Sequence, residues 1–345
     1  MKKILLVFSI FLLFSSCENK VEKVIPSFYY WKTDSYFSDV EKNYLDEFKI
    51  QKLYVKYFEV DYSEALGNFP IAKTVYRPNN YCNEDKSLTY EVIPTVYLKN
   101  IVFKKSSKKE LVKLADDVNY LIGKYTNEKV DSVPIKEIQM DCDWTASTKD
   151  NYFYFLKELK KISNKTISCT LRLYPYKYPD KMGVPPVDKA TLMCYNLINP
   201  LENPSKNSIL DLDELQSYLN IKQKYPLHLD VALPLYSWAQ IYQNNQFVKV
   251  IYNGDQLQKN MKKIKPFWYE VTKDTTINYE TYLRVGDKIK YEEIDANQVK
   301  KAISILKKDL KLDKEITVTL FHLDENQLSN YSNEEISSFY SSFSK

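Results

Sequence analysis

Apolar positions along the chain fall into eight short β-type runs, and most of these runs are separated by segments with helical spacing. The predicted strands are Phe28–Lys32, Leu53–Val60, Val92–Leu98, Glu137–Asp143, Ile167–Leu173, Thr191–Leu197, Leu229–Leu235 and Ile316–Leu323. Apolar stripes at helical spacing predict amphipathic helices within 111–122, 152–162 and 299–310. Eight strands that alternate with helices are typical of an α/β protein with a (β/α)8 TIM barrel.

A doubly wound open sheet shows a similar alternation and is the alternative fold. Such sheets commonly begin with a Gly-rich turn that binds a dinucleotide. The chain has only 5 glycines and contains neither that turn nor a P-loop. These absences favour the barrel, and we expect no nucleotide or other cofactor.

Residues 236–315, between the seventh and eighth predicted strands, are too many for one connecting helix. We predict a small β-rich insertion over about 239–294. Its turn signals are Asn253-Gly254-Asp255 and a hairpin in which Thr281–Val285 and Lys288–Glu292 flank Gly286-Asp287. The expected organisation is a single barrel domain over 27–345 with this insertion on its rim.

The first residues have the features of an export signal. Lys2 and Lys3 precede the apolar run Ile4–Phe14, which is shorter than the roughly 20 residues of a membrane-spanning helix. The segment Leu12-Leu13-Phe14-Ser15-Ser16-Cys17 resembles the lipobox of bacterial lipoproteins. This resemblance implies a signal peptide over 1–16, acyl chains on Cys17, and a flexible tether over 17–26. The expected location is the bacterial cell envelope, on a membrane and facing the periplasm or the cell surface. The alternative is an ordinary signal peptide with a chance cysteine.

Charge and composition exclude several classes of partner. A net charge of +4 over 345 residues gives no basic signature of nucleic-acid binding. The 2 histidines are too few for a histidine-based metal site. Cys142, Cys169 and Cys194 fall within predicted strands and are interpreted as small buried apolar residues, whereas Cys82 lies in a polar loop as a candidate free thiol. The 30 tyrosines include aromatic faces that suit sugar rings.

The fourth predicted strand carries the clearest candidate chemistry. Side chains alternate faces along a strand, so the apolar residues from Ile138 to Trp144 should face the helices. Asp141 and Asp143 should then project into the barrel at the carboxyl end of the strand, where TIM-barrel enzymes place their chemistry. Two like charges this close should raise one carboxyl pKa, which suits proton transfer. The alternative is a structural pair that is tied to Arg172 or to loop amides.

Polar and aromatic residues recur at the ends of the other predicted strands. These further candidates are Glu59, Asp61, Arg172, Tyr195, Asn196, Tyr236, Trp238, Asp324 and Glu325. A sugar site needs carboxylates that accept hydrogen bonds from the sugar hydroxyls, and aromatic rings on which the sugar can pack. The strand ends therefore predict an oligosaccharide or glycan as the partner.

Three motifs resemble those of family-18 glycoside hydrolases, the chitinases and endo-β-N-acetylglucosaminidases. Met140–Thr145 resembles the fourth-strand signature Asp-x-x-Asp-x-Asp-x-Glu, and Met193–Asn196 resembles the sixth-strand motif Met-x-Tyr-Asp. Ala232–Trp238 resembles the seventh-strand motif Gly-x-Pro-x-Tyr-Gly-Arg. The resemblance implies a barrel that binds and hydrolyses an oligosaccharide, with Asp143 and Tyr195 in supporting catalytic roles. Trp144 and Trp238 are candidate sugar platforms.

The chain departs from this family at two positions. The first Asp of the signature falls on Ile138, and the Glu that protonates the leaving oxygen falls on Thr145. A threonine hydroxyl does not give up a proton near neutral pH, and glycoside hydrolysis ordinarily needs a carboxylic acid there.

Three readings of the function remain open. A divergent glycoside hydrolase would use another acid, and the candidates for it are Glu59, Asp61, Asp324 and Glu325. A non-catalytic barrel would bind a glycan without cleaving it. An envelope protein with another role, such as assembly or adhesion, is the third. On the first reading, the catalytic candidates are Asp141, Asp143, Tyr195 and Glu59.

Overall fold

The computed structural model describes residues 20–32, 37–74, 89–129, 134–221, 223–252, 260–277 and 281–344. The predicted signal peptide, Cys17, Cys82 and the turn at Asn253 lie outside these ranges. Within them, no helix is both long enough and apolar enough to cross a membrane.

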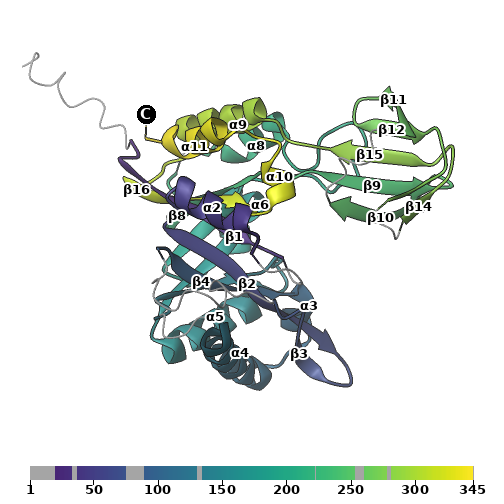
Figure 1. The fold of residues 1–345 in the computed structure, drawn as a ribbon. Helices are drawn as coiled ribbons and strands as arrows, with labels where there is room; N and C mark the ends of the chain where they lie inside the picture. Colours follow the sequence, from purple (N-terminus) through teal and green to yellow (C-terminus); the bar gives the residue numbers. More distant parts are fainter. Residues whose placement is uncertain are drawn as a thin grey trace, which may run out of the picture.

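Eight parallel strands close into a barrel (Figure 1). They are β1 (Lys23–Tyr30), β2 (Lys52–Ser63), β4 (Glu91–Leu98), β5 (Glu137–Asp141), β6 (Thr166–Arg172), β7 (Lys189–Met193), β8 (His228–Pro234) and β16 (Glu315–Phe321). Pairing of β1 with both β2 and β16 closes the ring. Every predicted strand overlaps one of these, so the TIM barrel is confirmed.

Helices cover the outside of the barrel, where the apolar side chains of the strands form the core. The three predicted stripes form α4 (Lys108–Lys129), α5 (Lys149–Ser163) and α9 (Ala296–Asp309). The α9 helix begins at a capping box between Asp295 and Gln298, which satisfies two backbone N–H groups. The remaining helices are α2 (Asp39–Glu47), α3 (Asn100–Lys105), α6 (Leu173–Lys177), α7 (Pro179–Met182), α8 (Leu212–Leu219), α10 (Glu325–Leu328) and α11 (Asn333–Ser341). One strand outside the ring, β3 (Gly67–Ile71), pairs antiparallel with the end of β2.

The insertion between β8 and α9 forms a separate antiparallel sheet that projects to one side of the barrel (Figure 1). Its five strands are β9 (Trp238–Gln243), β10 (Gln246–Tyr252), β11 (Met261–Lys265), β12 (Trp268–Val271) and β15 (Lys288–Glu292). Between β12 and β15, the chain forms a two-stranded sheet of β13 (Thr275–Ile277) and β14 (Thr281–Leu283). The predicted β-rich insertion is therefore present.

The predicted hairpin across Gly286-Asp287 is wrong. The strand at 281–283 pairs with β13, whereas the strand at 288–292 pairs with β9 and β12. Ile289 and Tyr291 join Ala239 and Ile241 in a small core of the insertion. Pairing with the longer strand β9 buries these apolar residues, so tertiary packing overrides the local turn signal.

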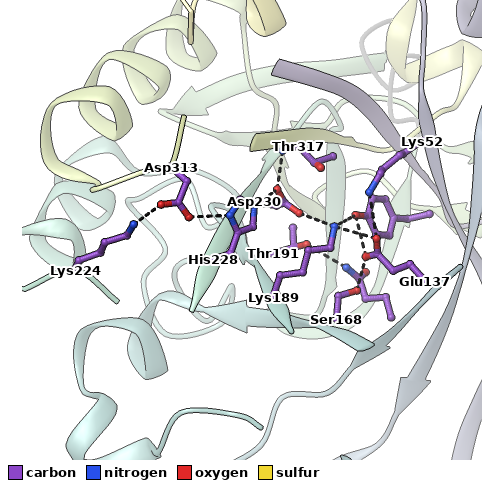
Figure 2. Close-up of polar contacts among 12 residues, drawn as sticks. Lys52, Glu137, Ser168, Lys189, Thr191, Lys224, His228, Asp230, Asp313 and Thr317 are labelled. Atoms are coloured by element: carbon purple, nitrogen blue, oxygen red, sulfur yellow. Dashed lines mark hydrogen bonds and ion pairs between the residues drawn. The ribbon is translucent and has the colours of Figure 1, made fainter. Parts of the chain in front are cut away.

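Polar side chains fill the amino end of the barrel interior (Figure 2). The buried Glu137 of β5 accepts hydrogen bonds from Ser168 at 2.7 Å and from Lys52 at 3.2 Å. Lys189 of β7 lies 3.0 Å from Glu137 and 3.0 Å from Asp230 of β8. Each buried charge therefore has an opposite charge in contact, which offsets the cost of its desolvation.

His228 links this network to the surface (Figure 2). Its Nε2 lies 3.2 Å from Asp230 and its Nδ1 lies 2.8 Å from Asp313, which also pairs with Lys224. Although burial alone would raise the pKa of Asp230, its contacts with His228, Lys189 and the Thr317 N–H lower that pKa to about 2. The hydrogen bond to Asp230, together with the charges of both carboxylates, raises the pKa of His228 despite its partial burial.

The raised pKa of His228 predicts a pH-dependent contribution to stability. Because the folded protein binds the imidazole proton more tightly than the unfolded chain, the stabilisation is complete below pH ~6.5 and is lost as pH rises through the raised pKa. We expect His228→Gln to lower the free energy of unfolding by about 1 kcal/mol more at pH 5.5 than at pH 9. Urea denaturation at both pH values measures this difference.

Lys224→Gln is the matched control, since it removes the other partner of Asp313 and leaves the imidazole in place. Its cost should be similar at pH 5.5 and pH 9. An equal cost of His228→Gln at both pH values would contradict the proton linkage.

Candidate functional site

A cavity of ≈240 Å³ lies at the carboxyl ends of the barrel strands, and we call it the central pocket. Its polar lining residues are Glu59, Asp141, Asp143, Arg172, Tyr195 and Asn196. Its aromatic lining residues are Trp31, Tyr97, Tyr236, Trp238, Tyr252 and Phe321. The pocket therefore combines carboxylates with aromatic faces at the end of the barrel that the sequence indicated.

Asp141 is the last residue of β5, and its side chain points into the barrel as strand alternation predicts. Its carboxylate accepts a hydrogen bond from the Thr170 hydroxyl of β6 at 2.6 Å, and only 8% of the residue is exposed. Burial, and next the negative charge of Asp143, raise the pKa of Asp141 to about 6. Asp141 can therefore hold a proton under mildly acidic conditions, which an ordinary aspartate does not.

Asp143 lies two residues further on and is bound by Arg172. The guanidinium donates through Nε at 2.6 Å and through Nη2 at 3.1 Å to the two carboxylate oxygens. Arg172 Nη1 also lies 3.4 Å from the Tyr195 carbonyl oxygen. This bidentate ion pair fixes the orientation of the Asp143 carboxylate. The ion pair with Arg172 that the sequence left open is therefore present.

Tyr195 has a buried hydroxyl group without a hydrogen-bond partner in the part of the chain that the structure describes. The side chain lines the central pocket and is 2% exposed, and its hydroxyl makes no hydrogen bond to any described residue. The ring packs against Phe321 with centroids 5.1 Å apart. A buried hydroxyl that lacks a partner costs about 1–3 kcal/mol, and a ligand oxygen in the pocket could remove that cost.

The insertion supplies one wall of the central pocket through Trp238 and Tyr252, whose rings lie 6.2 Å apart. Trp238 Nε1 donates to Glu292 at 2.7 Å. Glu292 is fully buried, and it also accepts hydrogen bonds from Gln240 and from Ser208, which lies in the loop after β7. The buried Lys290 lies 3.0 Å from Glu292. Glu292 therefore ties three segments together and fixes the position of Trp238.

Asn196 and Tyr236 complete the wall next to Tyr195. The Tyr236 hydroxyl donates to the Asn196 side-chain oxygen. Asn196 follows the end of β7 with a positive φ of 53°, a conformation that asparagine tolerates better than most residues. This backbone turn brings the amide of Asn196 to the pocket.

Of the four candidate replacement acids, only Glu59 lines the central pocket, where it pairs with Lys56 at 2.8 Å. Asp61 pairs with Lys99 at 2.6 Å, and this contact lowers the pKa of Asp61. The pair lies outside the residues that line the pocket.

Asp324 and Glu325 also lie outside the central pocket. Asp324 caps α10 by accepting from the N–H groups of Asn326 and Gln327. Burial alone would raise the pKa of Asp324, but the ion pair with Lys32 at 2.9 Å and the remaining contacts lower it. Glu325 donates its backbone N–H to Glu41. Asp324 thus serves the fold at this end, and neither residue is placed to protonate a ligand in the pocket.

Trp144 and Thr145 line a neighbouring cavity of ≈430 Å³, which we call the side pocket. Trp144 points toward α5, where its ring lies 5.4 Å from that of Tyr152, in agreement with the predicted strand alternation. Thr145 bonds to Ser147 and Thr148 in the turn that precedes α5. Trp144 is therefore not a platform of the central pocket.

Four aromatic residues of the central pocket are not among the candidates from the sequence. Trp31 directly follows β1, Tyr97 is the second-last residue of β4 and Phe321 is the last residue of β16, so these three lie at strand ends and could have been found there. Tyr252 ends β10 of the insertion, and no local pattern indicates that it reaches the barrel. Among the described residues, no cluster of His, Cys, Asp and Glu could hold a metal ion. Cys142, Cys169 and Cys194 are buried free thiols, as expected.

Comparison with known proteins identifies the fold. No protein-family model matches the chain, and no curated protein matches its sequence. The spore cortex-lytic enzyme SleL from Bacillus cereus superposes with a TM-score of 0.51 at 12% identity, over 93% of this chain and 75% of that chain. A chitinase from Bacillus thuringiensis gives 0.51 at 10% identity, over 94% and 70%.

A third match is a mutant GH18 chitinase from Cycas revoluta in complex with (GlcNAc)4. It gives a TM-score of 0.50 at 10% identity, over 92% of this chain and 99% of that chain. The chain therefore has a divergent barrel fold like that of family-18 chitinases. Identities this low establish the fold and leave the activity to be argued from the pocket.

Proposed function

We propose that the protein binds an oligosaccharide in the central pocket. The observation that carries this proposal is a pocket lined by carboxylates and aromatic rings, in which the buried Tyr195 hydroxyl makes no hydrogen bond to any described residue. A pyranose ring has apolar C–H faces and hydroxyl edges. Trp31 and Trp238 would pack against the faces, while Asp143 and Tyr195 would bond to the edges.

The size of the central pocket limits what it can hold. Its ≈240 Å³ lies below the range of about 300–1,000 Å³ that is usual for sites of drug-sized ligands. One sugar ring is therefore the natural occupant, and the rest of a longer ligand would extend outside. Oligomers of N-acetylglucosamine are the first probes to use, because the chitinase from Cycas revoluta binds (GlcNAc)4.

Hydrolysis by the mechanism of family 18 is not expected. Thr145 stands at the position of the family's acid, and its hydroxyl does not give up a proton near neutral pH. Asp141 is the pocket carboxyl whose raised pKa suits proton donation, but it is 8% exposed and bonded to Thr170. Binding without efficient cleavage is the function that this arrangement favours.

The first prediction for this site concerns the Tyr195 hydroxyl. We expect Tyr195→Phe to weaken (GlcNAc)4 binding about 3- to 10-fold, because one ligand hydrogen bond is lost. The same change should leave the free energy of unfolding equal or slightly higher, since the hydroxyl makes no hydrogen bond to any described residue. Calorimetric titration of the detergent-solubilised full-length protein and urea unfolding measure the two effects.

Tyr29→Phe is the matched control. Its hydroxyl donates to Gln139 at 2.8 Å in the barrel interior. Its loss should destabilise the fold by about 1 kcal/mol and leave ligand affinity unchanged. If wild type binds no glycan in the titration, the proposed function fails; if Tyr195→Phe binds as tightly as wild type, the assignment of its hydroxyl fails.

The second prediction concerns catalysis. Wild type should hydrolyse GlcNAc oligomers at a rate near background, because general acid assistance is worth ~10²–10⁴-fold in rate. Chromatography of (GlcNAc)4 incubated between pH 4.5 and pH 8 tests this, with Thr145→Glu assayed in parallel. Brisk wild-type hydrolysis that rises below pH 6 and disappears in Asp141→Asn would instead make the protein an enzyme with Asp141 as its acid.

We further propose that acyl chains on Cys17 anchor the protein to a membrane of the bacterial envelope. The support is the signal-type sequence before Cys17. The tether is shorter than the expected 17–26, because β1 begins at Lys23, where pairing with β16 extends the barrel strand. At about 3.3–3.6 Å per residue, this tether reaches at most roughly 20 Å. The amino ends of the barrel strands would then lie near the membrane, and the central pocket would face away from it.

The third prediction tests this anchor. Cys17→Ala should move the protein from the detergent-extractable membrane fraction to a soluble or uncleaved form, because the acylated thiol is lost. Cell fractionation with mass measurement of the mature amino terminus follows this change. Cys82→Ala is the control and should stay in the membrane fraction. Unchanged cleavage and membrane retention of Cys17→Ala would refute lipidation.

A further inference from the structure

The side pocket adjoins the central pocket at the carboxyl ends of β5 and β6. Asp143 and Arg172 line both cavities, so their ion pair forms the wall between them. The side chain of Asp143 is 47% exposed and that of Arg172 is 29% exposed. A ligand held in one pocket would therefore touch the same pair as a ligand held in the other.

The walls of the side pocket are preformed by packing. Trp144 donates its Nε1–H to the Met182 carbonyl at 3.2 Å and packs against Phe153, with centroids 5.9 Å apart. Gly183 follows α7 with φ of 75°, and a Cβ there would lie 2.6 Å from the Phe153 ring. Glycine thus allows the chain after α7 to close against α5 and hold Met182 in place.

The rim of the side pocket is polar, while its walls are mainly apolar. Lys181 donates to the Tyr174 hydroxyl at 2.9 Å. Tyr174 is 38% exposed, and the neighbouring Thr145 contributes a hydroxyl. Apolar walls from Trp144 and Pro175 with hydroxyl and amine groups at the mouth suit a second pyranose ring.

We propose that the side pocket holds the sugar unit next to the one in the central pocket, so that the oligosaccharide lies across the Asp143–Arg172 pair. This inference rests on the proposed function and specifies its ligand as at least a disaccharide. Arg172 occupies one lone pair on each oxygen of Asp143, which lines both cavities, so the other lone pairs can accept hydrogen bonds from sugar hydroxyls. The pair is then a contact shared by two subsites.

The test fills the side pocket and leaves the central pocket intact. Ala146 is exposed at the mouth of the side pocket and does not line the central pocket. Ala146→Trp should block the side pocket with an indole, whereas Ala146→Ser adds one oxygen and serves as the control. Calorimetry, with ligand-observed NMR for the monosaccharide, gives the affinities of GlcNAc and (GlcNAc)2 for the detergent-solubilised full-length proteins.

Wild type and Ala146→Ser should bind (GlcNAc)2 about 10-fold more tightly than GlcNAc. Ala146→Trp should lose this gain while its affinity for GlcNAc stays within about twofold of wild type. Equal affinities of wild type for GlcNAc and (GlcNAc)2, or a gain that Ala146→Trp keeps, would overturn the two-pocket ligand and leave the central pocket as a sugar site. Absence of binding to either probe would instead overturn the proposed function itself.

Discussion

Closure of the barrel places every second side chain of β5 in an interior where a polar group needs a partner. Glu137, Gln139 and Asp141 all point inward, and each finds its partners on other strands. Lysines neutralise Glu137, while Gln139 bonds to Tyr29 and Thr191, and Asp141 accepts from Thr170. Each inward side chain of β5 therefore has hydrogen-bonding or charged partners at its own level of the barrel interior. Charged partners surround Glu137 at the amino end, whereas a hydroxyl group bonds to Asp141 at the carboxyl end.

At the amino end of the barrel, the buried carboxylates are paired with positive charges. Asp230 and Glu137 are buried, but each contacts a lysine, and His228 and Lys224 carry the network out to Asp313 (Figure 2). At the carboxyl end, Asp141 has a raised pKa, and the Tyr195 hydroxyl makes no hydrogen bond to any described residue. Both residues line the central pocket, and this coincidence is the physical basis for placing ligand binding there.

The insertion takes part in the site as well as extending the fold. Glu292 collects hydrogen bonds from the loop after β7 and from β9, and one of its donors is the indole of Trp238. The aromatic wall therefore depends on a buried carboxylate far from it in sequence. Removal of Glu292 would leave the buried Lys290 without its carboxylate, so the wall and the stability of the insertion are coupled.

The sequence by itself determined the eight strands, three of the helices and the inward direction of Asp141, because these follow from local periodicity. The tertiary structure decided the rest. It separated Asp61, Asp324 and Glu325 from the central pocket by giving them other partners, and it brought in Tyr252 from the insertion. It also paired β15 with β9 in place of its neighbour in the chain. Strand register, ring closure and long-range ion pairs are set by contacts between distant residues, and no local pattern encodes them.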